Sequence, residues 1–245
     1  MSKFVIQATW DDAPHLSEQD KADLYASYPA YQRDARTKGV PQLGSGAIYP
    51  IPESEIVVDD FELPAHYPRS YGLDVGWNRT AAVWGARNNE SGVIYLYSEY
   101  YRGQAEPVIH SQAIRSRGDW IPGVIDPASR GRSQADGRKL FQDYKDLGLD
   151  LEISTNAVEA GLLETWQLLS FGKLKVFRSL VNWLTEFRIY QRDERGQVVK
   201  SNDHLMDATR YFVLSGRDRM VCKPLPPREV VEYRYPGQER QGWMR

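Results

Sequence analysis

The chain has 245 residues, of which 41% are hydrophobic and 26% are charged, and its formal net charge at pH 7 is −2. This composition supports a packed core, and the near-neutral charge excludes a protein that binds nucleic acid over its whole surface. The single cysteine excludes an intramolecular disulfide and a cysteine-type zinc site, and the four histidines show no zinc-ligand spacing. Since there is no apolar run of membrane-spanning length and no signal peptide, we expect a soluble intracellular protein without membrane contact.

The first 68 residues lack the pattern of a self-contained domain. Their glycines and prolines divide them into short segments. The pattern allows a strand over 4–10, predicts two short helices within 17–35 separated by Pro29, and predicts a loop over 39–52 followed by a connector over 53–68.

From residue 69 onward, strand and helix periodicities follow one another in a specific order. Three antiparallel strands are predicted over 69–76, 80–87 and 93–102, followed by a helix over 106–117, a strand over 120–126, a helix over 134–147 and a strand over 149–153. Two further helices around 158–169 and 180–187, a hairpin over 190–200 and a last helix over 203–214 precede a basic, proline-containing tail over 217–245. Right-handed crossovers would place the fourth strand beside the first.

Aspartates stand at three points of this pattern. Asp74 ends the first strand between Gly72 and Gly76, Asp126 ends the fourth strand, and Asp207 lies on the last helix. A carboxylate at the end of a buried strand needs a partner or a cation, and several converging carboxylates suit Mg²⁺. The structural alternatives are a turn aspartate at position 74 and a surface helix acid at position 207.

Three motifs, in this order, carry a family resemblance: Gly-Leu-Asp-Val-Gly-Trp at 72–77, Ile-Asp-Pro-Ala-Ser at 125–129 and Asn-Asp-His-Leu-Met-Asp-Ala-Thr-Arg-Tyr at 202–211. Over about 69–216 the chain resembles the nuclease domain of the large terminase subunits of tailed bacteriophages. The resemblance implies an α/β fold with a ribonuclease H-like mixed sheet and helices on both faces. It also implies that 1–68 is a connector from an ATPase domain. Since nothing matches Gly-x-x-x-x-Gly-Lys-[Ser/Thr], we expect the ATPase half to lie outside this chain.

The same resemblance implies a Mg²⁺- or Mn²⁺-dependent endonuclease that cleaves concatemeric double-stranded phage DNA during genome packaging, with little sequence specificity. Asp74, Asp126 and Asp207 would be the catalytic metal ligands, with Asp74 bridging two divalent ions. Asp203 is a fourth candidate ligand, or a helix N-terminal carboxylate favoured by the dipole. The implied partners are DNA, the ATPase domain, the portal and the small terminase subunit, in the cytoplasm of the infected bacterium and outside the mature virion. The isolated domain is expected to be a monomer.

Two basic segments are candidates for phosphate contacts, although a solvated charged loop is the alternative for each. They hold Arg130, Arg132, Arg138 and Lys139 after the fourth strand, and Arg192, Arg195 and Lys200 in the hairpin. His204 is expected to be exposed or to cap the last helix, and Glu99 and Glu186 are expected to form structural pairs.

Three different functions also remain open from the sequence. Asp74-Val75-Gly76 followed by Thr80 resembles the first phosphate loop of actin-like sugar kinases and chaperone ATPases, but the second lobe and second glycine-rich loop of that fold are missing. The chain could also be another ribonuclease H-like nuclease, of the resolvase or transposase type. The third function is that of a non-catalytic DNA-packaging assembly module, in which the acids are structural.

Overall fold

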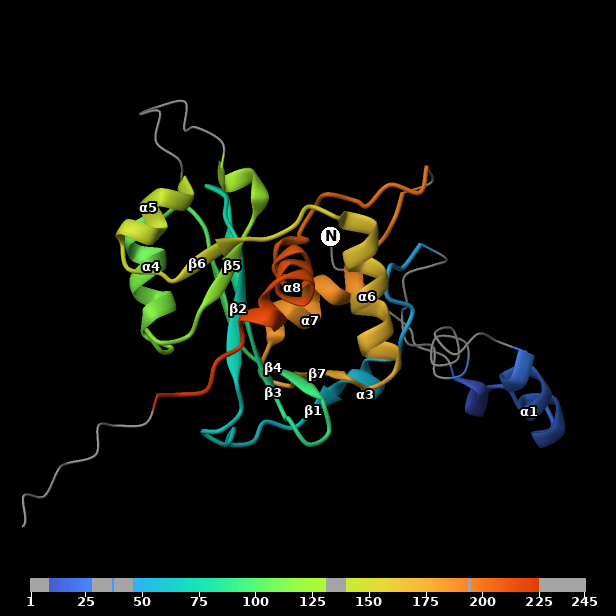
Figure 1. Ribbon diagram of the computed structural model, residues 1–245. Coiled ribbons are helices and arrows are strands. Elements are labelled where there is room, and N and C mark those ends of the chain that lie inside the picture. Colours follow the sequence, from blue (N-terminus) through green and yellow to red (C-terminus); the bar gives the residue numbers. More distant parts are fainter. Residues whose placement is uncertain (1–8, 28–36, 38–45, 131–139, 194, 225–245) are drawn as a thin grey trace, which may run out of the picture.

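The computed structural model describes residues 9–27, 37, 46–130, 140–193 and 195–224. At its centre lies a seven-stranded mixed sheet with the strand order β1-β7-β4-β3-β2-β5-β6 (Figure 1). Strands β2, β3 and β4 are antiparallel neighbours, and the remaining pairs are parallel. The strands are β1 (Val57–Val58), β2 (Arg69–Asp74), β3 (Thr80–Arg87), β4 (Ile94–Arg102), β5 (Gly123–Ile125), β6 (Leu151–Ile153) and β7 (Leu174–Phe177).

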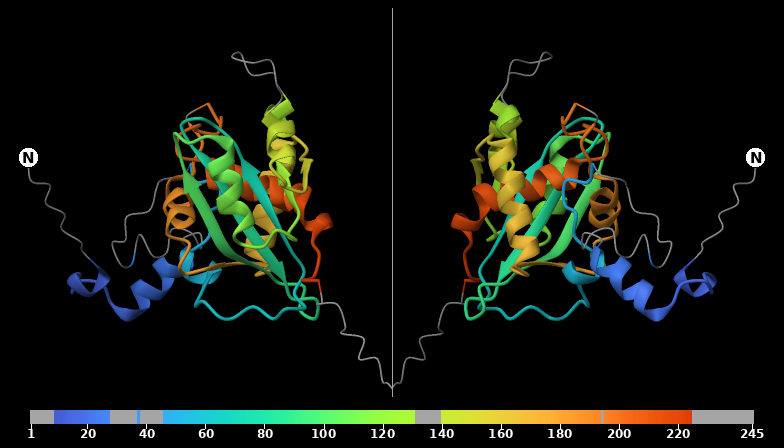
Figure 2. Two further views of the ribbon diagram at one scale, coloured as in Figure 1. Left: turned by 90° about the vertical axis from the view of Figure 1, so that its left-hand side faces the viewer. Right: turned by 90° about the vertical axis from the view of Figure 1, so that its right-hand side faces the viewer.

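Helices cover both faces of the sheet, so the predicted α/β architecture is confirmed. Figures 1 and 2 show α4 and α5 on one face and α6, α7 and α8 on the other. The helices are α1 (Glu18–Ser27), α3 (Glu53–Ile56), α4 (Pro107–Arg115), α5 (Leu140–Asp146), α6 (Val158–Ser170), α7 (Val181–Ile189) and α8 (His204–Leu214), with 3₁₀ turns η1 (Trp10–Asp12), η2 (Pro127–Arg130) and η3 (Gly216–Arg219). Within the described residues, no helix combines the length and the apolar character that crossing a bilayer requires.

Strand β3 shows why the sheet is buried on both sides. Its side chains alternate between the two hydrophobic cores: Ala81 and Val83 belong to the core under α6, α7 and α8, and Ala82 and Trp84 to the core under α4 and α5. All four are fully buried. A continuous apolar strand of this kind is expected where helices cover both faces.

The predicted position of the fourth strand beside the first is confirmed by the pairing of β5 with β2. The two strands are parallel, with Leu73 opposite Ile125, so their carboxyl ends meet at one edge of the sheet. The predicted hairpin over 190–200 is present as an antiparallel bridge between Arg192 and Val198. The proposed strand over 4–10 and the second helix within 17–35 lie almost entirely outside the described residues.

Segments on both sides of residues 69–216 contact the sheet. Within residues 53–68, β1 pairs with β7 and Ile56 is completely buried. After residue 216, Val221 forms an antiparallel bridge with Arg69. Strand β7 was absent from the sequence prediction. β1 and β7 have two and four residues, too few to show a period.

Two glutamates, the half-buried Glu99 and the buried Glu186, set the starts of two successive helices. Glu99 on β4 accepts hydrogen bonds from the backbone N–H groups of Asn182 and Trp183 in the first turn of α7. Glu186 on α7 in turn accepts from the N–H groups of Leu205 and Met206 in the first turn of α8. Since these donors have no partner within their own helices, the glutamates fix where α7 and α8 begin. The structural roles expected for both residues are confirmed.

Glycine allows α8 to lie directly on the sheet. A Cβ atom at Gly72 of β2 would lie 2.0 Å from the carbonyl oxygen of Ala208, and one at Gly85 of β3 would lie 2.2 Å from the ring of Phe212. The first of these contacts is with backbone, which cannot rotate away. The absence of a side chain at Gly72 therefore lets the backbone of α8 lie against β2, two residues before Asp74.

Candidate active site

Asp74 and Asp126 lie at the carboxyl ends of two neighbouring strands of the sheet. Asp74 is the last residue of β2, and Asp126 directly follows β5. The backbone N–H of Asp126 donates to the carbonyl oxygen of Leu73 across the two strands, at 3.0 Å. The parallel pairing predicted from the element order thus places both carboxylates at one edge.

Helix α8 contacts both of these carboxylates. His204 Nδ1 lies 3.0 Å from Asp74 Oδ2, and the hydroxyl of Tyr211 donates to Asp126 Oδ1 at 3.0 Å. Asp207 lies on α8 between these two residues, and its side chain is 13% exposed. The three aspartates predicted from separate motifs therefore all lie on α8 or in contact with its side chains.

Basic side chains surround the carboxylates on α8. Asp207 accepts from Arg210 Nη2 at 2.9 Å on one oxygen and from Lys200 Nζ at 2.8 Å on the other. Lys200 also lies 3.0 Å from Asp203 Oδ2. Asp203 occupies the N-cap position of α8, but its side chain forms no capping hydrogen bond there.

Burial and charge both perturb Asp74. Burial, together with the neighbouring charges of Asp207 and Asp126, raises the pKa of Asp74 to about 6, against the opposing hydrogen bond from His204. The hydrogen bond with Asp74 raises the pKa of His204 in turn. This edge therefore carries more negative charge than its own cations neutralise, which favours binding of a further cation.

The chemistry of the three aspartates fits a divalent metal. Among the described residues, no three His, Cys, Asp or Glu side chains are already grouped as metal ligands. The aspartate oxygens are instead hydrogen-bonded or ion-paired to His204, Tyr211, Lys200 and Arg210. Carboxylate oxygens without thiolates suit Mg²⁺ or Mn²⁺. Asp74, Asp126 and Asp207 would hold the metal, and Asp203 lies near enough to share Lys200 with Asp207.

His204 was missed by the sequence prediction. The expectation of an exposed or capping histidine differs from its hydrogen bond to Asp74, with a side chain 33% exposed. Its position directly after Asp203, at the start of a helix, gave no indication of its orientation. Which side chains of α8 face Asp74 depends on the rotation of the helix about its axis. That rotation is constrained by the contact of α8 with Gly72 and by the cap that Glu186 provides.

The predicted phosphate-contact residues divide into three groups. Arg132, Arg138 and Lys139 lie outside the described residues, and Arg130 ends η2. The guanidinium of Arg192 pairs with Glu159 at 2.6 Å, and Lys200 pairs with Asp203 and Asp207. Arg195 lies exposed at the tip of the hairpin, before Gly196. Their role in binding DNA stays a prediction.

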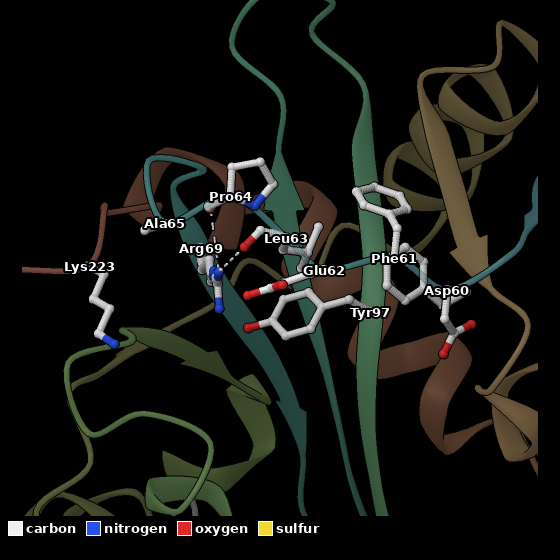
Figure 3. A pocket seen from close by; sticks show the side chains of 10 residues that line it. Asp60, Phe61, Glu62, Leu63, Pro64, Ala65, Arg69, Tyr97 and Lys223 are labelled. Carbon is white, nitrogen blue, oxygen red and sulfur yellow. Dashed lines mark hydrogen bonds between the residues drawn. The ribbon is translucent and has the colours of Figure 1, made fainter.

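A hollow of about 770 Å³ is lined by Arg69, Tyr97, Lys223 and side chains of the segment 60–65 (Figure 3). In it, Arg69 donates to the carbonyl oxygens of Leu63 and Pro64, and its guanidinium lies 5.4 Å from the ring centroid of Tyr97. None of Asp74, Asp126 and Asp207 lines this hollow. Since its acidic Asp60 and Glu62 offset the basic Arg69 and Lys223, we do not assign it to the candidate active site.

The mixed sheet with three antiparallel strands, parallel flanking strands and aspartates at adjacent strand ends defines a ribonuclease H-like domain. A family model described as the terminase RNaseH-like domain matches residues 71–215, which is more than half of the chain. The chain therefore belongs to the terminase RNaseH-like domain family. The resemblance inferred from the three motifs is confirmed.

Relatives in sequence agree with this assignment. The large terminase subunit of Salmonella phage P22 is 34% identical over 239 residues, which cover 93% of this chain and 48% of that protein. The large terminase subunit of Enterobacteria phage LP7 is 34% identical over 220 residues, covering 86% of this chain and 46% of that protein. The chain thus spans about half the length of the curated relatives it matches.

The fold is similar to solved terminase structures. The P22 large terminase nuclease domain superposes with a TM-score of 0.66 at 32% identity, covering 73% of this chain and 96% of that domain. The large terminase of a thermophilic bacteriophage gives a TM-score of 0.61 at 22% identity, covering 84% of this chain and 55% of that protein. The nuclease domain of the large terminase of bacteriophage SPP1, solved with bound Mn, gives 0.50 at 18% identity, with 66% and 95% coverage.

Proposed function

We propose that this chain is a metal-dependent endonuclease domain that hydrolyses phosphodiester bonds of double-stranded phage DNA during genome packaging. The observation that supports the proposal is the position of Asp74 and Asp126 at the ends of two adjacent parallel strands, with Asp74 near enough to Asp207 of α8 for their charges to interact. The solved P22 domain, described as a nuclease domain, supports the activity. The SPP1 domain with bound Mn makes Mn²⁺ the first metal to test, with Mg²⁺ as the second.

In this proposal the aspartates hold two divalent ions, and the residues of α8 orient the aspartates. Bound divalent ions would activate a water molecule and stabilise charge on the attacking and leaving oxygens. Tyr211 fixes one oxygen of Asp126 through its hydroxyl, and His204 fixes one oxygen of Asp74. Since each carboxylate has two oxygens, the second oxygen of each stays available as a ligand.

The substrate and partners follow from the family and are part of the same proposal. Double-stranded DNA would be bound chiefly through phosphates, so that cleavage would have little sequence specificity. The ATPase domain, the portal and the small terminase subunit are the proposed partners, and the cytoplasm of the infected bacterium is the proposed location. The domain by itself is proposed to be a monomer that binds DNA weakly, because its cations are divided among separate segments.

Cleavage of supercoiled plasmid in the presence of Mn²⁺ or Mg²⁺ tests the activity. The unsubstituted chain should convert the plasmid to open-circular and linear forms at high protein concentration, and chelation of the metal should stop the conversion. Asp74→Asn, Asp126→Asn and Asp207→Asn should each abolish it. Asp150→Asn is the matched control, because Asp150 is a surface acid paired with Arg219. Equal cleavage by all four variants would refute the assignment of the site.

The proposed phosphate contacts have a separate test. Replacing Arg130 and Arg132 together by alanine should weaken DNA binding. The slope of log affinity against log salt concentration should become shallower by about two, one unit for each lost phosphate contact. Metal binding should be unchanged. An unchanged salt dependence would refute these contacts, and one sharp cleavage site in an arbitrary plasmid would refute the low specificity.

A further inference from the structure

Trp77 stands exposed beside the candidate active site. It lies in the loop that joins β2 to β3, three residues after Asp74, and 64% of its surface is exposed. Tryptophan has the largest apolar surface of any side chain and stabilises a protein most when it is buried. Single exposed apolar side chains are common on protein surfaces, so the position of Trp77 needs an argument beyond its exposure.

The backbone of the loop is held against a second loop. The carbonyl oxygen of Trp77 accepts a hydrogen bond from the N–H of Gln104 at 2.8 Å, and Thr80 Oγ1 donates to the carbonyl oxygen of Gly76 at 3.1 Å. A Cβ atom at Gly103 would lie 2.0 Å from the carbonyl oxygen of Asn78. The loop is thus closed on itself by the Thr80–Gly76 hydrogen bond and held against the second loop at Trp77 and Asn78, so the backbone that carries Trp77 is fixed.

A cation accompanies the exposed ring. Arg79, two residues after Trp77, places its guanidinium 4.4 Å from the ring centroid of Tyr101 on β4. Stacking on Tyr101 fixes the position of this charge without neutralising it. The loop therefore presents an apolar aromatic surface and a positive charge directly after a proposed metal ligand. An aromatic ring with an adjacent cation is the combination that binds nucleic-acid strands by stacking and by charge.

We propose that Trp77 stacks on a nucleobase of the DNA held at Asp74, Asp126 and Asp207. The inference rests on the proposed function and adds to it a class of preferred substrate. In a continuous duplex, both faces of every internal base are covered by neighbouring bases, so a ring can stack only where a base is unpaired or unstacked. The domain therefore prefers DNA that is locally opened next to the scissile phosphate. Arg79 contacts a phosphate beside that base.

Phe171 provides the matched control. It is 76% exposed at the C-terminal end of α6. It shortly precedes β7, whose first residue Leu174 pairs with Ile94 at the start of β4. Trp77 precedes Thr80, which pairs with Arg102 at the other end of β4. The two exposed aromatic residues thus lie toward opposite ends of the sheet.

DNA binding is measured with Asp74→Asn present in every protein, so that cleavage does not interfere. The probes are a fluorescein-labelled paired duplex and the same duplex with a central unpaired stretch. Trp77→Ala should weaken binding to the opened probe about tenfold, within the range found when a base-stacking aromatic residue is removed. The salt dependence should stay unchanged, because no phosphate contact is lost. Trp77→Phe should retain most of the affinity, and Phe171→Ala should retain all of it.

Fluorescence gives a second measurement of the same contact. The opened probe should quench the tryptophan emission of the protein that contains Trp77. It should quench the emission of Trp77→Phe less, because this variant lacks the fluorophore but keeps a stacking ring. Arg79→Ala, in contrast, should reduce the salt dependence by about one unit.

Several results would overturn the inference: wild-type affinity in Trp77→Ala, equal losses on both probes, equal losses in Phe171→Ala, or no binding of either probe by the parent protein at low salt. Cleavage by the unsubstituted chain tests the proposed function independently. A chain that cleaves plasmid but binds DNA equally well without Trp77 would overturn only this inference. A chain with Trp77-dependent binding that never cleaves would overturn only the proposed function.

Discussion

Lys200 Nζ bridges two carboxylates of the candidate active site, at 2.8 Å from Asp207 Oδ2 and 3.0 Å from Asp203 Oδ2. The ammonium group therefore neutralises in part the carboxylates that are proposed to bind a divalent ion. A metal ion that coordinates Asp207 competes with Lys200 for the same oxygen. The hairpin residue predicted to contact phosphate is thus expected to affect the affinity for metal as well.

Lys200→Met should tighten the binding of Mn²⁺ by up to about fivefold, because the energy of a partly exposed ion pair is about 0–1 kcal/mol. Titration calorimetry with MnCl₂ measures the effect without any substrate. Lys175→Met is the control, because Lys175 donates to the carbonyl oxygen of Glu55 rather than to a carboxylate of the site. Weaker Mn²⁺ binding in Lys200→Met would show that the ammonium assists the metal rather than competing with it.

Asp74→Asn should raise the melting temperature of the metal-free protein. Asp74 is buried near the charges of Asp207 and Asp126, so its ionised form is disfavoured, and asparagine keeps an oxygen that can accept from His204. At about pH 8 a gain of ~1 kcal/mol would raise the melting temperature of a domain of this size by roughly 2–4 °C. Differential scanning calorimetry measures it.

Mn²⁺ should reverse the order of the melting temperatures of the unsubstituted chain and Asp74→Asn. A metal that binds only the folded protein stabilises it in proportion to the logarithm of its concentration, so millimolar Mn²⁺ should stabilise the unsubstituted chain and leave Asp74→Asn unchanged. An equal shift in both proteins would mean that Asp74 is not a ligand.

Glu186→Ala should lower the free energy of unfolding by about 1–3 kcal/mol, because two buried N–H groups at the start of α8 would lose their acceptor. Glu186 is 2% exposed, and its Oε2 lies 2.6 Å from the N of Leu205. Urea unfolding measures the loss. Glu159→Ala, which removes an exposed acid paired with Arg192, should change the free energy much less. Equal losses would contradict the capping role.

The proximity of Asp74 to Asp126 could be predicted from the sequence, because it depends on the order of the elements and on the handedness of crossovers. The parallel neighbourhood of β2 and β5 follows from those two alone. Contact between Asp74 and His204 could not be predicted, because it depends on the rotation of α8 about its axis. That rotation is constrained by the close approach of Ala208 to Gly72 and by the capping of α8 by Glu186, and both are tertiary contacts.

The edge of the sheet beyond β4 was missed for a different reason. Strand β1 has two residues and β7 has four, and periodicity needs more residues than that to appear. Leu174 and Val176 are completely buried because β4 and α6 pack around them. Val57, the partner of Val176 in β1, comes from a segment whose acids and prolines predict a connector, so the parallel pair is visible only after folding.

His110 should make the stability of the domain depend on pH. It is 2% exposed, and its Nδ1 lies 2.7 Å from the hydroxyl of Tyr100. Burial lowers the pKa of His110 below its ordinary value of 6.5. A lowered pKa means that the unfolded chain takes up the proton first as the pH falls. The contribution to stability is therefore complete above about pH 6.5 and is lost as the pH falls below it.

His110→Gln removes this titrating group. Urea unfolding at about pH 7.5 and about pH 5.5, on either side of the ordinary histidine pKa, compares the two proteins. The unsubstituted chain should lose more stability between the two values than His110→Gln does, whatever the stability of the variant at the higher pH. A larger loss in the variant would contradict the lowered pKa, since the sign of the linkage would then be opposite.

Gly72→Ala should displace α8 and thereby disable the site without altering any proposed ligand. The added Cβ would lie 2.0 Å from the carbonyl oxygen of Ala208 and 2.9 Å from the backbone N of Phe212. Since both atoms belong to the helix backbone, the whole helix must shift, and we expect a loss of about 3 kcal/mol or more in the free energy of unfolding. The same shift should separate His204 from Asp74, so Mn²⁺ affinity should fall in the folded fraction.

Gly216→Ala is the milder comparison, because its Cβ would meet only the side chains of Phe212 and Val124, at 3.1 and 3.3 Å. Urea unfolding and Mn²⁺ calorimetry on both variants separate the two effects. If Gly72→Ala is no less stable than Gly216→Ala, or binds Mn²⁺ as tightly as the unsubstituted chain, then the close contact of α8 with β2 does not position the candidate active site.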